Sequence, residues 1–333
     1  LATFGLMNAN NLKNIGIIMG GYSHEYEISL KSGMVVYKTL KDHYNCYRIL
    51  IKENNWSLID ENDNVNTIDK ESFKVTDYPY LIFDCIFNAI HGTPGEDGKM
   101  QKYFSDKKIP ITGCDSYQSE LTFDKVKCLN FLSSKGIKVA PSVSISKNDK
   151  TNFTEIEAKI GFPCFVKASN SGSSFGVYKV YNKDEMLNCL DSAFEVDNKV
   201  LVESYIDGRE FSIGVISFNG ENKVLPITEI ITSNDFFDYE AKYSGQSEET
   251  TPAQIPAEVY QKVMQLSEAA YRLLELKGLS RVDYILDADN EPVLIEVNTV
   301  PGFSEESLLP KQALYAGISL PELFRASVEK TLS

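Results

Sequence analysis

The sequence RVDYILDADNEPVLIEVNTVPG spans residues 281–302 and predicts a β-hairpin. Its two halves, 281–287 and 292–298, alternate polar with apolar residues, the pattern of strands that place one face against a core. The short polar segment 288–291 between them predicts the turn. The chain is therefore expected to carry a pair of neighbouring strands near its C-terminus.

The polar side chains of this hairpin form a chemically specific set. Side chains alternate between the faces of a strand, so Arg281 and Asp283 point the same way, and Glu296 and Asn298 share a face of the second strand. Two carboxylates and an amide oxygen beside apolar packing suit Mg²⁺. Pro301-Gly302 then makes a rigid turn whose backbone can approach a ligand. The alternative is a surface hairpin with ordinary polar alternation.

A glycine- and serine-rich loop, KASNSGSSFG at 167–176, follows the predicted strand 163–167. Backbone N–H groups and hydroxyls of such a loop can donate hydrogen bonds to phosphates, and Lys167 would add a positive charge. The loop matches neither the G-x-x-x-x-G-K-[ST] nor the G-x-G-x-x-G pattern. A plain flexible turn is the other interpretation.

Two further turns follow predicted strands of the N-terminal part. HGTPGEDG at 91–98 stands after the buried strand 81–88, and open α/β sheets collect ligands at the carboxyl ends of strands. GGYSHEYE at 20–27 precedes a helix that is expected from Ser29, and a carboxylate there could hold an ammonium group. For 91–98 the alternative is a capped turn whose histidine is already hydrogen-bonded. For 20–27 the alternative is a glutamate that is favoured simply because it stands at a helix N-terminus.

The polar segment 233–251 contains YEAKY at 239–243 and has no strong periodicity. Long segments without structure are usually functional or disordered. A lid over an active site and a solvated linker are the two interpretations.

The predicted fold class combines α/β and α+β parts in three domains. Strands at 14–19, 81–88 and 109–113 predict a parallel α/β layer, with 55–77 as a meandering edge. Short strands at 163–167, 177–180 and 199–203 predict an antiparallel middle part. Helices are expected at 124–136 and 257–277, with helical segments at 308–323. The predicted domains are 1–121, 122–207 and 208–333.

Composition narrows the class of protein. The chain has 333 residues, 43% hydrophobic and 24% charged, which is typical of a globular protein and excludes a disordered or fibrous one. Its formal net charge of −14 gives no indication of nucleic-acid binding. No apolar run reaches the length of a membrane span, and the opening residues lack the pattern of a signal peptide. Met7 is a candidate natural start after Leu1–Leu6.

The cysteines indicate a reducing compartment, and the cysteines and histidines together argue against a zinc site. Six cysteines are scattered without a C-x-x-C pattern, and only three histidines are present. Cys85, Cys128, Cys164 and Cys189 sit beside apolar residues and are expected to be reduced core thiols. The cytoplasm is therefore the expected location.

Taken together, these segments resemble the D-alanine–D-alanine ligase family of the ATP-grasp superfamily, from about Asn14 to the C-terminus. Residues 91–101 meet the family pattern H-G-x-x-G-E-D-G-x-x-Q in full, and the hairpin meets R-x-D followed by E-x-N-x-x-P-G. The resemblance implies an ATP-grasp fold preceded by a Rossmann-like domain. It also implies that ATP phosphorylates one D-alanine, whose acylphosphate a second D-alanine attacks, supplying a dipeptide for peptidoglycan synthesis.

The resemblance implies a role for each matching residue. Glu25 would hold the first D-alanine's ammonium group and would be linked to Ser173 and Tyr243, while Arg281 and the Gly302 N–H would stabilise the oxyanion. The other implied binding residues are Lys125, Lys167 and Lys242 for ATP phosphates, Glu203 and Glu210 for adenine and ribose, Ser307 and the Leu308 N–H for the second carboxylate, and His91 near the substrates. Asp283, Glu296 and Asn298 would hold two Mg²⁺ ions, for which Mn²⁺ can substitute. A homodimer is a further expectation from the family, and neither a nucleic acid nor a membrane is an expected partner.

The sequence departs from the family at Ala168, where proline is common, and at Phe175, where valine is common. Neither change removes a reacting group. Tyr243 favours D-alanine over D-lactate as second substrate, because members that use D-lactate usually lack this tyrosine. D-Serine stays open as second substrate. The alternative from another functional class is a nucleotide-binding protein without ligase activity, a degenerate relative of the family. Such a protein would be expected to lack at least one of the reacting residues.

Overall fold

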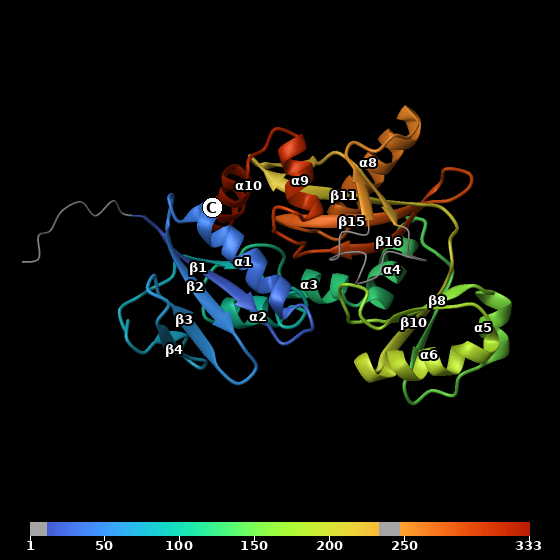
Figure 1. The fold of residues 1–333 in the computed structure, drawn as a ribbon, viewed down its shortest axis with the longest axis horizontal. Helices are drawn as coiled ribbons and strands as arrows, with labels where there is room; N and C mark the ends of the chain where they lie inside the picture. The colour runs from blue at the N-terminus through green and yellow to red at the C-terminus, as the bar shows by residue number, and fades with distance from the viewer. Residues whose placement is uncertain (1–11, 233–246) are drawn as a thin grey trace, which may run out of the picture.

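The computed structural model describes residues 12–232 and 247–333, and these form three β-sheets with helices packed on them (Figure 1). The first sheet lies in the blue N-terminal part of the figure. The second lies with the green and yellow helices, and the third with the orange and red ones. The predicted lid spans 233–251, and its residues up to 246, with Lys242 and Tyr243, lie outside the described residues. The expectation of a segment without structure is wrong for its last part, because 247–250 form a strand that pairs with 229–232. The three predicted domain ranges stay predictions.

The first sheet has six strands and combines parallel with antiparallel pairs. In spatial order they are β5 (Lys74–Val75), β4 (Val65–Asp69), β3 (Trp56–Ile59), β2 (Asn45–Ile51), β1 (Asn14–Gly20) and β6 (Cys85–Asn88). Strand β1 pairs in parallel with β2 and β6, whereas β2 to β5 form an antiparallel meander at the edge. The predicted parallel layer and meandering edge are confirmed. The helices of this part are α1 (Tyr26–Leu40), α2 (Lys99–Asp106) and α3 (Ser116–Phe123).

Two strand predictions in this part were wrong in extent. Segment 109–113 is not a strand: it makes a single parallel bridge between Ile86 and Ile111. Pro110 lacks an N–H and Gly113 has φ of 94°, so the segment cannot continue a ladder in either direction. The predicted strand 81–88 is extended only from Cys85, because Leu81 closes a turn back to the Tyr78 carbonyl.

The second sheet is antiparallel throughout, as expected. Its order is β7 (Ser142–Ser146), β10 (Lys199–Ser204), β8 (Cys164–Ala168) and β9 (Val177–Val180), with helices α5 (Phe153–Lys159) and α6 (Lys183–Val196). Alternation divides its side chains: Val166 and Val202 join the core under α6, so Lys167 and Glu203 lie on the opposite face. This opposite face carries the polar groups of the site.

The third sheet is antiparallel and contains the predicted hairpin. Its order is β14 (Ser247–Thr250), β13 (Thr228–Thr232), β11 (Arg209–Phe218), β15 (Leu279–Leu286) and β16 (Pro292–Asn298), and β12 (Glu221–Val224) pairs with β11. Val282 and Tyr284 enter the core with helices α4 (Lys125–Ser134) and α8 (Ala257–Leu273). Helix α8 ends four residues before the predicted end at Lys277, because Glu275 adopts φ of 54°.

The C-terminal helices connect the third sheet to the first. The predicted helical segments at 308–323 are α9 (Leu308–Tyr315) and α10 (Leu320–Leu332), separated by Gly317 with φ of 77°. The predicted end at 323 was too early, because α10 continues to Leu332. Helix α10 packs beside α1 (Figure 1), and both share one apolar core with β1 and β6. Phe303 and Phe324 meet Phe87 of β6 edge-on, with ring centroids 5.7 and 5.6 Å away. This core brings the segment after β16 against the N-terminal sheet.

Candidate active site

The hairpin brings its four predicted side chains together. In the register of β15 and β16, Asp283 lies opposite Glu296, and Arg281 lies opposite Asn298. Arg281 donates from Nε and Nη2 to Asp283 Oδ1 and Oδ2 at 2.9 and 2.8 Å. Ser212 of β11 donates to Asp283 Oδ1 at 2.7 Å. Asp283 is thus held from a third strand, by a residue that no sequence pattern indicated.

The donor set of the hairpin fits Mg²⁺. Asp283 and Glu296 offer carboxylate oxygens and Asn298 an amide oxygen, the hard ligands that this cation prefers. Both carboxylates now face protein cations: Arg281 bonds to Asp283, and Lys125 Nζ lies 3.0 Å from Glu296 Oε1. Within residues 12–232 and 247–333, no group of three or more His, Cys, Asp or Glu side chains could hold a metal. A metal here would therefore depend on the amide and on ligands from a bound nucleotide.

A cavity of about 500 Å³ opens between the second and third sheets. Apolar side chains line part of it, among them Phe165, Ile206, Ile230, Ile285 and Ile295. The charged residues of the site line it as well, namely Lys125, Lys167, Glu203, Glu210, Arg281, Asp283 and Glu296. A pocket with apolar walls and a few convergent polar groups is typical of a small-molecule site.

Glu203, which lines this cavity, has an unused acceptor. It is 2% exposed, and its Oε1 lies 2.6 Å from Lys167 Nζ in a buried ion pair. Its Oε2 has no hydrogen-bond partner among the described residues. Buried acceptors are nearly always satisfied, so an orphaned one facing a cavity indicates a ligand that donates to it.

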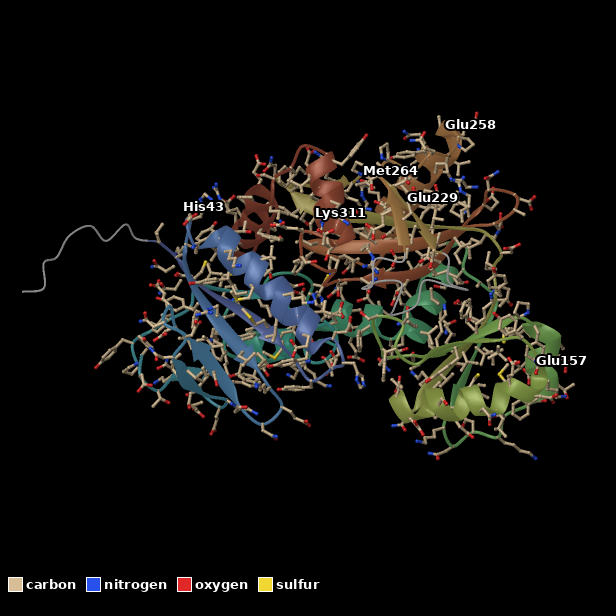
Figure 2. The ribbon with its side chains drawn as sticks, viewed as in Figure 1. His43, Glu157, Glu229, Glu258, Met264 and Lys311 are labelled. Carbon is tan, nitrogen blue, oxygen red and sulfur yellow. The ribbon has the colours of Figure 1, made fainter. Side chains whose placement is uncertain are left out.

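A second glutamate lining the cavity has a different environment. Glu229 of β13, labelled in Figure 2, accepts from Arg209 Nε and Nη2 at 2.7 Å each. Both of its carboxylate oxygens are therefore engaged. This bidentate pair lies at the cavity wall, and Glu229, unlike Glu203, has no carboxylate oxygen without a partner.

The glycine- and serine-rich loop reaches across to Glu25, as the family resemblance implied. Ser173 donates its hydroxyl to Glu25 Oε1. A Cβ on Gly172 would overlap Glu25 Oε2, so only glycine allows this close approach of the loop backbone. Ser173 and Ser174 both adopt positive φ, at 50° and 58°, a conformation that costs L-residues energy and that clusters at ligand sites.

The loop's start is anchored by a buried aspartate that the sequence analysis did not single out. Asp124 accepts from Ser169 Oγ at 2.7 Å and from Lys199 Nζ at 3.0 Å, and it caps α4 by accepting from the Lys127 N–H. Lys125 follows it directly and donates to the Ser171 carbonyl. One residue thus joins the phosphate-type loop to the helix that presents Lys125.

His91 lies in the interior with both ring nitrogens engaged. Its Nδ1 is 2.9 Å from the Val300 carbonyl, and its Nε2 is 2.8 Å from Ser32 Oγ. Burial lowers the pKa of His91, so the ring is neutral at pH 7. The side chain contacts the segment after β16 and is 4% exposed.

The segment after β16 places the last predicted residues at the start of α9. Ser307 is the residue before this helix, and Leu308 is its first residue, so the Leu308 N–H belongs to the helix N-terminus, which favours a carboxylate. Ser307 Oγ lies 2.8 Å from Ser304 Oγ. A Cβ on Gly302 would stand 2.5 Å from Ser307 Oγ, so the turn packs directly against Ser307.

Glu96 was part of the quoted glycine-rich motif but received no role. It accepts from the Gly92 N–H at 2.6 Å and from the Val300 N–H at 3.3 Å. Burial, followed by the charge of Glu25, raises the pKa of Glu96 to about 8. The signal that could have found it is the motif itself, since a carboxylate flanked by glycines can accept backbone N–H groups.

The sheets and the cavity between them define the ATP-grasp class, in which two sheets enclose a nucleotide. The family described as D-ala D-ala ligase N-terminus matches residues 14–114, and the one described as D-ala D-ala ligase C-terminus matches residues 131–329. The chain belongs to the D-alanine–D-alanine ligase family.

Named relatives match over nearly the whole chain. A D-alanine–D-alanine ligase of Flavobacterium johnsoniae is 52% identical over 97% of this chain and 100% of its own length. The corresponding ligase of Christiangramia forsetii is 47% identical over 96% of this chain and 99% of its own.

Solved structures agree with this family. VanG D-Ala:D-Ser ligase from Enterococcus faecalis superposes with a TM-score of 0.84 at 31% identity, covering 96% of this chain and 99% of that one. D-Alanine–D-alanine ligase from Bacillus anthracis complexed with ATP has a TM-score of 0.79 at 32% identity, covering 97% of each chain.

Proposed function

We propose that this protein joins two D-alanine molecules into D-alanyl-D-alanine and converts ATP to ADP and phosphate. The observation that carries the proposal is the position of the paired carboxylates Asp283 and Glu296, with Lys125 and Arg281, on the wall of a cavity whose apolar sides suit a nucleotide base. The relatives named D-alanine–D-alanine ligase and the ATP complex of the Bacillus anthracis enzyme support it.

The reaction has two steps. An oxygen of the first D-alanine's carboxylate attacks the γ-phosphorus of ATP, and ADP leaves with the electrons of the broken P–O bond. The amine of the second D-alanine then attacks the acyl carbon, loses a proton, and expels phosphate from the tetrahedral intermediate. A carboxylate is a poor electrophile until one oxygen is phosphorylated, so positioning and charge stabilisation supply the catalysis.

The residues divide between nucleotide and substrates. Lys125 and Lys167 would bind phosphate oxygens, and Glu203 and Glu210 would bind adenine and ribose. The orphaned Oε2 of Glu203 supports this assignment, because adenine and ribose both offer hydrogen-bond donors.

The amino-acid substrates would lie toward the first sheet and α9. Glu25, linked to Ser173, would hold the first ammonium group. Arg281 and the Gly302 N–H would stabilise the oxyanion, and Ser307 with the Leu308 N–H would take the second carboxylate. Tyr243 and Lys242, predicted to complete this site, lie outside the described residues. His91 would support the site without touching a substrate, because both its ring nitrogens already bond to protein groups.

Asp283, Glu296 and Asn298 would hold two Mg²⁺ ions, for which Mn²⁺ can substitute. The metal would neutralise charge on the transferring phosphoryl group. Glu296→Gln removes one anionic ligand, and we expect it to abolish Mg²⁺-dependent turnover while circular dichroism stays that of the parent protein. Full activity of this variant at ordinary Mg²⁺ concentration would refute the metal assignment.

A D-alanine–D-serine ligase is the second candidate, because VanG, a D-Ala:D-Ser ligase, superposes over nearly the whole chain. Phosphate release is measured with D-alanine alone and with D-alanine plus D-serine or D-lactate, and the products are identified by mass. We expect the D-alanine dipeptide from D-alanine alone. No turnover with D-alanine alone would reject the main proposal.

The cellular setting follows from the same chemistry. The product would enter peptidoglycan precursor synthesis in the cytoplasm. All six cysteines are free thiols, in keeping with a reducing compartment; Cys85, Cys128 and Cys164 are buried as predicted, Cys189 is half-buried, and Cys114 is buried as well. No helix among the described residues is long and apolar enough to cross a membrane. A homodimer is proposed from the family, and light scattering coupled to size exclusion would test it.

A further inference from the structure

The segment that follows β16, residues 299–303, is held by side chains of the N-terminal part. Three buried residues do this: Ser32 of α1, and His91 and Glu96 of the turn after β6. Their partners are backbone groups of Val300 and Phe303, more than 200 positions away along the chain. These contacts join the first sheet to the turn that contains Gly302.

The partners determine the direction of each hydrogen bond. A carbonyl can only accept, so His91 Nδ1 must donate to Val300 O, 2.9 Å away. The neutral ring then has an accepting Nε2, to which the Ser32 hydroxyl donates at 2.8 Å. Ser32 Oγ in turn accepts from the Phe303 N–H at 3.2 Å. The chain Phe303–Ser32–His91–Val300 is complete, with no donor facing a donor.

Glu96 holds the same segment at one further point. Its Oε1 accepts from the Val300 N–H, while its Oε2 accepts from the Gly92 N–H. Val300 is therefore held through both its N–H and its carbonyl, and Phe303 through its N–H. Only Pro301 and Gly302 lie between these points, and proline has a restricted φ. Little freedom is left for the direction of the Gly302 N–H.

We propose that Ser32 is a positioning residue for the ligation reaction: by joining His91 to the Phe303 N–H it holds Val300 and Phe303, and so aims the Gly302 N–H at the oxyanion of the tetrahedral intermediate. The inference rests on the proposed function of Gly302. Ser32 itself touches no substrate in this scheme, being 1% exposed and surrounded by protein.

Helix α1 offers a matched control for this serine. Ser29, one turn earlier, is 0% exposed and likewise accepts one N–H, from Gly20 at 2.8 Å, and donates once, to the Ala89 carbonyl at 2.7 Å. Its partners are Gly20, the last residue of β1, and Ala89, the residue that follows β6. Ser29→Ala and Ser32→Ala therefore remove the same hydroxyl from the same helix at equal burial, but only Ser32→Ala releases the segment 300–303.

The experiment compares kcat, the KM for D-alanine, the Kd for ATP and the thermal midpoint in the parent protein and both variants. Removing one oxyanion donor costs about 100- to 1,000-fold in kcat, so misdirecting one should cost about 10- to 100-fold. We expect this loss in Ser32→Ala with the ATP Kd unchanged, and a kcat within about threefold of the parent in Ser29→Ala. Both variants should lose similar thermal stability.

Three outcomes overturn the inference: equal kcat losses in the two variants, an unchanged kcat in Ser32→Ala, or a loss confined to the ATP Kd. If Ser32→Ala does not fold, Ser32→Cys keeps a group of similar size with a weak donor, and it must show the same loss in kcat alone. Failure of the proposed function would look different, because the parent protein would then release no phosphate with D-alanine.

Discussion

Glu203 offers the sharpest test of the nucleotide site. Glu203 lines the cavity, its Oε1 bonds to Lys167 Nζ at 2.6 Å, and its buried Oε2 has no hydrogen-bond partner among the described residues. In Glu203→Gln the amide oxygen must face Lys167, since a lysine only donates. The amide NH₂ then replaces Oε2 and meets the nucleotide's donor with another donor. We therefore expect ATP binding to weaken strongly.

The size of the effect follows from the bond that is lost. A hydrogen bond to a charged group contributes about 1.5–3 kcal/mol. With about 1.4 kcal/mol for each tenfold change in affinity, the Kd for ATP should rise roughly 10- to 150-fold. Because the variant's amide NH₂ would also face a donor of the nucleotide, we expect the rise in the ATP Kd to lie at the upper end of this range.

Titration calorimetry with ATP and Mg²⁺ measures the change, and Glu229→Gln is the matched control. Glu229 lines the same cavity, but Arg209 occupies both its oxygens. We expect the ATP Kd of Glu229→Gln to stay within about threefold of the parent value. Equal weakening of ATP binding in both variants would mean that the loss of a negative charge from the cavity, and not the acceptor Oε2, causes the effect. A change below about threefold in Glu203→Gln would refute the assignment of Oε2 as a nucleotide acceptor.

Three further outcomes are expected. Gly172→Ala should displace the Glu25 carboxylate, which its Cβ would overlap, and raise the KM for D-alanine more than the Kd for ATP; steady-state kinetics with an unchanged KM would contradict this. The pKa of Glu96 is raised from its ordinary 4.5 to about 8, so the folded protein holds this proton more tightly than the unfolded chain does. As the pH rises from 4.5 to 8, the contribution of Glu96 to the free energy of unfolding should therefore fall, by up to about 1.4 kcal/mol per pH unit. Urea unfolding of the ligand-free protein should show a flatter pH slope in Glu96→Gln, and an equal slope would reject the shift. Ser212→Ala removes a 2.7 Å bond to Asp283 and should lower the free energy of unfolding by about 1.5–3 kcal/mol, measured by the same titration; no loss would show that this bond contributes nothing.

Local patterns predicted the elements whose signals are short-range, but strands β2, β7 and β11 to β14 and helices α2, α3, α5 and α6 were not predicted. The hairpin of β15 and β16, the strands β8, β9 and β10, and the long helix α8 were expected within a few residues of their bounds. Helix α6 was not among the predicted elements, although Met186, Leu190 and Ala193 line its buried face behind the cap Asn182. Where prediction was wrong, at 109–113, a single proline and a glycine ended the ladder despite an apolar sequence.

Motif spacing likewise indicated the chemistry of the site but not its supports. The carboxylates of the hairpin, the glycine- and serine-rich loop and the turn at 91–98 were all identified from residue types in order. Ser212 and Ser32 were not, because a serine in a strand or helix carries no periodic signal, and Asp124 is marked by its position only as the cap of α4. Their roles depend on which backbone or side chain packs opposite them.

The sequence by itself determined the hairpin of β15 and β16, the strands β8, β9 and β10, the long helix α8 and the family of this protein, because periodicity and motifs depend on a few neighbouring residues. Only the tertiary structure decided that Val300 lies between His91 and Glu96. These contacts join segments 204 and 209 positions apart. They arise from the summed packing of three sheets and the shared core of α1 and α10, which no single stretch of the chain encodes.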